Sequence, residues 1–120
     1  MSKSILIVED EVSLAHVMKQ ALSKDDIRVS VAHNGREALA VMEKEVPDVV
    51  LLDILMPHGD GHEVLKAMKE KNMGSTVVVV SNLSDQKTRN ACRDYNVRDY
   101  FIKSDIDEGD LWGAIEKHLR

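Results

Sequence analysis

Short apolar runs that alternate with helical patterns restrict the fold of this sequence more than any other feature. Five runs are typical of strands: Ser4–Val8, Ile27–Val31, Val49–Leu52, Thr76–Val80 and Asp99–Ile102. After each run, apolar residues recur at the three- and four-residue spacing of an amphipathic helix. These stripes fall within Leu14–Leu22, Ala38–Met42, Val64–Met68, Thr88–Tyr95 and Leu111–Leu119. Crossovers between parallel strands are right-handed and cover both faces of a sheet. The pattern therefore predicts an α/β fold with a five-stranded parallel sheet and five helices.

Three segments add detail to this prediction. Ile27–Val31 alternates strictly between apolar and polar residues, which predicts a half-exposed edge strand, whereas Val49–Leu52 is apolar throughout and predicts a strand buried on both faces. Asp53–Gly61 contains one proline and two glycines. We expect this last segment to be an irregular loop.

Length and composition limit the class of protein. The chain has 120 residues, which is enough for one core, and we expect a single domain over residues 1–120. Its formal net charge of -5 argues against direct binding to nucleic acid. Cys92 is the single cysteine, which excludes an internal disulfide and indicates a reducing compartment. No apolar run approaches the ~18 residues of a membrane span, so we expect a cytoplasmic protein with no membrane partner.

Polar residues follow four of the predicted strands directly. Glu9 and Asp10 follow the first, Asp53 the third, Ser81 the fourth and Lys103 the fifth. The carboxyl ends of parallel strands share one edge of a sheet, where α/β proteins bind ligands. Asp53 is the candidate nucleophile, because a carboxylate can attack phosphorus to give an acyl phosphate. Carboxylates of Glu9, Asp10 and Asp53 suit Mg²⁺, while Lys103 and Ser81 would bind phosphoryl oxygens.

Read in order, these residues resemble the response-regulator receiver domains of two-component signalling. The resemblance rests on Glu9-Asp10, Asp53 with Met56-Pro57 and Asp60-Gly61, Ser81, and Tyr100-x-x-Lys103, and it covers essentially the whole chain. It implies a doubly wound, flavodoxin-like sheet with strand order 2-1-3-4-5, as in single-domain chemotaxis regulators.

The resemblance also implies partners and further ligands. The phosphodonor would be a phosphohistidine on a sensor histidine kinase or phosphotransfer protein, and the signal would pass to a downstream protein target or output domain. The backbone carbonyl of Leu55 would complete the protein ligands of Mg²⁺.

A conformational switch is a further implication of the resemblance. Tyr100 stands where the family carries an aromatic residue that swings inward on phosphorylation, as the Ser81 hydroxyl moves toward Asp53. We expect this movement to alter a surface around the fourth helix, the fifth strand and the fifth helix. The resemblance is also compatible with a dimer that forms on phosphorylation.

The sequence departs from the family pattern at positions that bear on the lifetime of the phosphoryl group. Leu55 and Leu83, two residues after Asp53 and Ser81, stand where the family lines the route of the hydrolytic water. Leucine offers no hydrogen bond to orient water, which predicts slow self-dephosphorylation. Ser104 follows Lys103 where many receivers have a proline preceded by a cis bond, and the sequence leaves the geometry of this bond open.

Two other functions compete with the receiver interpretation. A Mg²⁺-dependent phosphatase of the haloacid-dehalogenase type needs a second aspartate two residues after the nucleophile as its general acid. Leu55 occupies that position, so we expect no enzyme beyond self-phosphorylation and self-dephosphorylation. A flavodoxin-like redox module needs a hydroxyl- and glycine-rich loop after the first strand, where this chain has Glu9-Asp10-Glu11.

Other residues carry weaker signals. His16, His33 and His118 fall at predicted polar helix or turn positions and indicate no role in phosphorelay. Trp112 lies off the apolar stripe of its helix, which leaves two interpretations open: a partly exposed recognition anchor near Tyr100, or a ring packed against neighbouring helices. No linker follows the last helix, so the chain would be either a complete single-domain regulator or a receiver excised from a longer protein.

Overall fold

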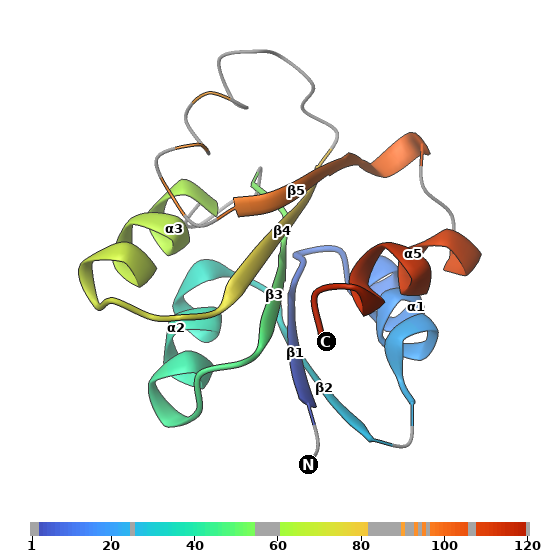
Figure 1. Cartoon of the computed structure of the whole chain (residues 1–120), viewed down its shortest axis with the longest axis horizontal. Coiled ribbons are helices and arrows are strands. Elements are labelled where there is room, and N and C mark those ends of the chain that lie inside the picture. The colour runs from blue at the N-terminus through green and yellow to red at the C-terminus, as the bar shows by residue number, and fades with distance from the viewer. Residues whose placement is uncertain are drawn as a thin grey trace.

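A twisted parallel sheet of five strands runs through the centre of the molecule (Figure 1). The computed structural model describes residues 3–24, 26–54, 61–81, 90, 93, 95, 97–105 and 108–119. The strands are β1 (Lys3–Val8), β2 (Ile27–Ala32), β3 (Val49–Leu52), β4 (Thr76–Ser81) and β5 (Val97–Ile102). They lie in the order β2-β1-β3-β4-β5, with every neighbouring pair parallel. The predicted sheet and its strand order are confirmed.

Helices cover both faces of this sheet (Figure 1). They are α1 (Val12–Leu22), α2 (Gly35–Lys44), α3 (Gly61–Glu70) and α5 (Glu108–Glu116). Helices α2 and α3 pack on one face, and α1 and α5 pack on the other. The doubly wound architecture is therefore confirmed, while most of the predicted fourth helix lies outside the described residues. None of the helices in the described part of the chain is long and apolar enough to cross a membrane.

Strand β5 begins two residues earlier than the sequence pattern predicts. Val97 pairs with Val77 and Asp99 pairs with Val78, so Arg98 is an extra residue at an irregularity in the register. An inserted residue interrupts the alternation of side chains between the two faces of a strand. The amino-terminal end of β5 could therefore not be recognised from periodicity.

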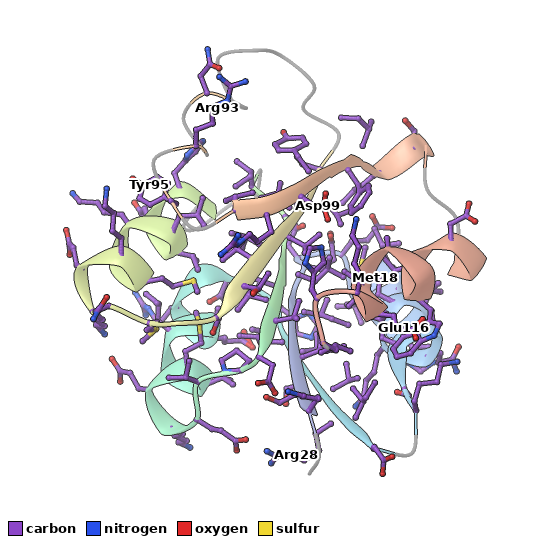
Figure 2. The ribbon with its side chains drawn as sticks, viewed as in Figure 1. Met18, Arg28, Arg93, Tyr95, Asp99 and Glu116 are labelled. Carbon is purple, nitrogen blue, oxygen red and sulfur yellow. The ribbon has the colours of Figure 1, made fainter. Side chains whose placement is uncertain are left out.

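The sheet separates two apolar clusters, which we call the α2/α3 layer and the α1/α5 layer. Alternate residues of the three central strands β1, β3 and β4 belong to different layers: Leu6 and Val8 of β1 lie in the first, whereas Ile5 and Ile7 lie in the second. Met18 of α1 lies in the α1/α5 layer (Figure 2). Because both faces are covered, the strand at the centre of the sheet, β3, is apolar along its whole length.

The environment of Trp112 decides between its two interpretations. Its half-buried ring packs in the α1/α5 layer, with the Lys24 ammonium 5.2 Å from the ring centre. Tyr100 packs in the α2/α3 layer, on the opposite face of the sheet. Of the two interpretations left open, the one that places Trp112 near Tyr100 is therefore wrong, and packing against neighbouring helices is confirmed.

Helix α3 begins in direct contact with the backbone that follows β3. The Gly61 amide donates a hydrogen bond of 2.7 Å to the carbonyl of Ile54. A Cβ atom on Gly61 would lie 2.6 Å from Ile54 Cα and 2.8 Å from the Asp53 carbonyl oxygen. Any side chain at this position would push α3 away from the segment that carries Asp53. The predicted irregular loop between them falls largely on residues 55–60, which lie outside the described residues.

Candidate functional site

Two buried carboxylates lie just beyond the carboxyl ends of adjacent strands. Glu9 follows β1 and Asp53 follows β3, and they are only 1% and 5% exposed. Backbone hydrogen bonds continue the sheet pairing to these residues, from the Glu9 amide to the Ala32 carbonyl at 3.0 Å and from the Asp53 amide to the Val8 carbonyl at 3.1 Å. The sheet itself therefore sets the positions of both carboxylates, as the sequence predicts.

Asp10 completes an acidic group at this edge. Each of Glu9, Asp10 and Asp53 offers one carboxylate oxygen, and these three atoms lie within 4.8 Å of one another. Carboxylate oxygens at this spacing form a donor set suited to a hard divalent cation such as Mg²⁺. The chemistry of the residues thus fits the predicted metal.

Lys103 reaches the acidic group from the far edge of the sheet. It follows β5, yet its Nζ lies 2.9 Å from Asp53 Oδ2 and 2.8 Å from Glu9 Oε2. The side chain is only 15% exposed. One ammonium thus bridges two buried carboxylates from different strands, which gives each of them a charged partner.

Burial and charge together shift the proton affinities of this group. Burial of the Glu9 carboxyl, reinforced by the nearby Asp53 charge, holds its pKa above the ordinary value although Lys103 donates a hydrogen bond to it. Burial by itself would lower the pKa of Lys103, but its hydrogen bonds to Glu9 and Asp53 outweigh that effect and raise it. Lys103 therefore remains charged while it contacts the two acids.

The two predicted switch residues lie on the neighbouring strands. Ser81 is the last residue of β4 and is fully buried, and it pairs in register with Ile102 of β5. Tyr100 of β5 is half-buried and packs in the α2/α3 layer. No peptide bond among the described residues is cis, so the Lys103–Ser104 bond is trans.

Several predicted site residues lie outside the described part of the chain. Leu55, whose carbonyl was expected to bind Mg²⁺, belongs to the segment 55–60, together with Met56-Pro57 and Asp60. Leu83 belongs to the segment 82–89. Their roles stay predictions based on the sequence.

His33 contacts the site, although the sequence analysis assigned it no role. Its Nδ1 lies 3.1 Å from the backbone carbonyl oxygen of Glu9. His33 directly follows β2, the strand next to β1. Its place just past a strand end, at the same edge as the acidic group, is the feature of the sequence that could have identified it.

The arrangement combines a buried carboxylate with groups that bind anions and cations. Asp53 lies beside an ammonium that can contact phosphoryl oxygens and beside two further carboxylates that can share a divalent cation. Phosphoryl transfer depends mainly on positioning and charge neutralisation. The described site supplies charged groups that can position a phosphoryl group and neutralise its charge.

Comparison with known proteins agrees with this geometry. Residues 5–116 match the model of the response regulator receiver domain. The chain is 32% identical over 120 residues to sporulation initiation phosphotransferase F of Bacillus subtilis, an alignment that covers 99% of this chain and 95% of that protein. It is 31% identical over 117 residues to the response regulator ArlR of Staphylococcus saprophyticus, covering 97% of this chain and 52% of ArlR.

Solved structures show the same architecture. A CheY-like response regulator receiver domain protein from Methanospirillum hungatei superposes with a TM-score of 0.89 at 28% identity, covering 99% of this chain and 94% of that one. The chain spans less than half the length of several transcriptional regulators that it matches. On the family match and the agreement along its length, this chain belongs to the response regulator receiver domain family.

Proposed function

We propose that this chain accepts a phosphoryl group on Asp53, from a phosphohistidine of a sensor histidine kinase or phosphotransfer protein. The observation that carries the proposal is the buried Asp53 carboxylate, which lies close to the carboxylates of Glu9 and Asp10 and contacts the Lys103 ammonium. Phosphorylation on an aspartate is characteristic of the receiver family. Asp53 has the central position in this site that such an acceptor requires.

In the proposed transfer, an Asp53 carboxylate oxygen attacks the phosphorus atom of the phosphohistidine. A phosphorus–oxygen bond forms, the phosphorus–nitrogen bond breaks, and the departing imidazole nitrogen takes up a proton from solvent. Lys103 changes partners in this step: its ammonium, now on Asp53 Oδ2, would contact the negative oxygens of the incoming group. The Ser81 hydroxyl, at the end of β4, would donate a hydrogen bond to the same group.

Receivers generally bind Mg²⁺ at an acidic pocket, and this donor set fits that ion. We propose that Glu9, Asp10, Asp53 and the Leu55 carbonyl would hold it. When bound, Mg²⁺ supplies positive charge that offsets the carboxylates and the phosphoryl oxygens. With that positive charge beside the Lys103 ammonium, a phosphoryl group would meet less repulsion from the three carboxylates as it approaches Asp53.

We assign the whole of residues 1–120 to one receiver domain in the cytoplasm, acting on a downstream protein target or output domain. We propose no catalysis beyond its own phosphorylation and dephosphorylation. A phosphatase with an aspartate nucleophile needs a second aspartate two residues later as general acid, and Leu55 occupies that position.

Incubation with Mg²⁺ and acetyl phosphate tests the central claim. Intact mass spectrometry is expected to show one added phosphoryl group on the wild-type chain and none on Asp53→Asn, because the amide is not a nucleophile of comparable strength. Omission of Mg²⁺ should reduce the yield strongly. A phosphorylated Asp53→Asn chain, or no adduct on the wild type, would contradict the proposal.

Ser81 and Tyr100 form the proposed switch. Tyr100 packs in the α2/α3 layer, on the strand next to β4, so movement of the Ser81 backbone toward Asp53 would change the space beside its ring. NMR of the Tyr100 ring, with and without beryllofluoride as phosphoryl mimic, is expected to show a changed environment that Asp53→Asn abolishes. An unchanged ring spectrum in the loaded wild type would refute the switch.

The phosphorylated state should be long-lived because of Leu55 and Leu83. Leu55→Asn and Leu83→Glu are each expected to accelerate phosphate loss, since the new side chain can orient the attacking water. A hydrogen bond of about 1 kcal/mol corresponds to roughly a fivefold change in rate. The decay of phosphorylated mass after removal of the donor gives this rate, with Val46→Asn at the opposite edge of the sheet as control. Equal or slower decay in both leucine variants would show that these positions do not limit hydrolysis.

An exposed apolar residue beside the site favours a macromolecular donor. Val12, the first residue of α1, is 66% exposed and follows the Glu9-Asp10-Glu11 segment. We expect Val12→Asp to slow transfer from a histidine phosphotransfer domain by about tenfold, the equivalent of about 1.4 kcal/mol of lost contact. The rate with acetyl phosphate should not change, because a small donor covers little surface.

Val46 provides the matched control for this experiment. It is 50% exposed but lies between α2 and β3, at the amino-terminal ends of the strands. Arg28, labelled in Figure 2 near the start of the chain, marks the same end of the molecule. Val46→Asp is expected to leave both donors unaffected. If Val12→Asp slows acetyl phosphate equally, the change has damaged the site and not a docking surface.

A further inference from the structure

Two consecutive residues at the end of β2 hold both backbone groups of Glu9. The Ala32 carbonyl accepts a hydrogen bond from the Glu9 amide at 3.0 Å. The next residue, His33, places its Nδ1 at 3.1 Å from the Glu9 carbonyl oxygen. A carbonyl oxygen only accepts, so Nδ1 is the ring nitrogen that carries the proton in this contact.

The His33 contact begins where the regular sheet ends. The paired register of β1 and β2 runs as far as Val8 and Ala32. Beyond that pair the chain turns toward α1, and the side chain of His33 replaces the backbone group that would continue the pairing. The His33 side chain therefore holds the peptide group that joins Glu9 to Asp10.

A second contact fixes the other side of this turn. The Glu11 amide donates to Glu9 Oε1 at 3.3 Å, so Asp10 lies between two held residues. The orientation of the Glu9 carbonyl determines the direction in which the Asp10 side chain leaves the backbone. Rotation of this peptide would move the Asp10 carboxylate away from Glu9 and Asp53.

We propose that His33 is a positioning residue for the acidic group, and that its imidazole keeps Asp10 in the orientation in which three carboxylates face one cation. The inference rests on the proposed function, since it assigns a support to the same site. His33 is not one of the three carboxylate donors and contacts one of them only through the backbone. Its effect on a bound ion is therefore indirect.

The start of α2 does not account for the His33 side chain. Asn34 caps that helix, because its Oδ1 accepts from the Glu37 amide at 2.9 Å. Its Nδ2 donates to the Glu37 carboxylate at 3.0 Å, which completes the cap. The helix is thus closed by Asn34, and the described contact of the His33 ring is directed to the acidic loop.

Calorimetric titration with Mg²⁺ alone tests this inference without any phosphodonor. His33→Ala is expected to bind Mg²⁺ about tenfold more weakly than the wild type, at the lower end of the effect of lost supporting contacts in metal sites. His33→Asn should recover most of the affinity, because its amide nitrogen can reach nearly the position of Nδ1. His16→Ala, on the exposed face of α1, is the matched control and should bind like the wild type.

Long-range proton–nitrogen NMR spectra provide a second, spectroscopic readout. They are expected to show His33 protonated on Nδ1 in the metal-free wild type. The Nε2-protonated form would overturn the inference, as would unchanged Mg²⁺ affinity in His33→Ala. Equal weakening of the alanine and asparagine variants would overturn it too, because the loss would then not depend on the donor. If the wild type binds no Mg²⁺, the proposed metal site is wrong, and the inference about His33 is then overturned as well.

Discussion

The ion cluster of Lys103, Glu9 and Asp53 is the interaction on which the rest of the site depends. Its members follow three different strands, and the two carboxylates are almost fully buried. Removing one partner of a buried ion pair costs about 3–5 kcal/mol, a large part of the 5–15 kcal/mol by which a domain is stable. The cluster therefore links the outermost strand β5 to the centre of the sheet, and the protein carries its own counterion in the unphosphorylated state.

Much of this arrangement could be predicted from the sequence because the topology leaves few choices. Apolar runs such as Val49–Leu52 are too short and too continuous for an exposed helix, and the stripes between them have helical spacing. Once the strands are parallel, residues that follow them must meet at one edge. Glu9, Asp53 and Ser81 could thus be placed without knowledge of any side-chain conformation.

What could not be predicted depends on register and on side-chain reach. The extra residue Arg98 concealed the start of β5, since it breaks the alternation on which the prediction relied. The face on which Trp112 packs depends on how α5 lies against the sheet, which local periodicity does not define. To predict the contact of His33 with the Glu9 carbonyl, one would have to know how the ends of β1 and β2 are aligned along the sheet. The close approach of Gly61 to Ile54 is likewise a property of the assembled backbone.

The separation of the two apolar layers has a consequence for how such a protein can diverge. Tyr100 and Phe101 are neighbours in β5, but the first packs in the α2/α3 layer and the second in the α1/α5 layer. Substitutions on opposite faces of a sheet share few neighbours, so their effects on stability tend to add independently. Evolution can therefore remodel one side of the molecule for a new partner while the other side preserves the fold. Because Lys103 directly follows β5, the strand that both layers contact also positions the ammonium of the site.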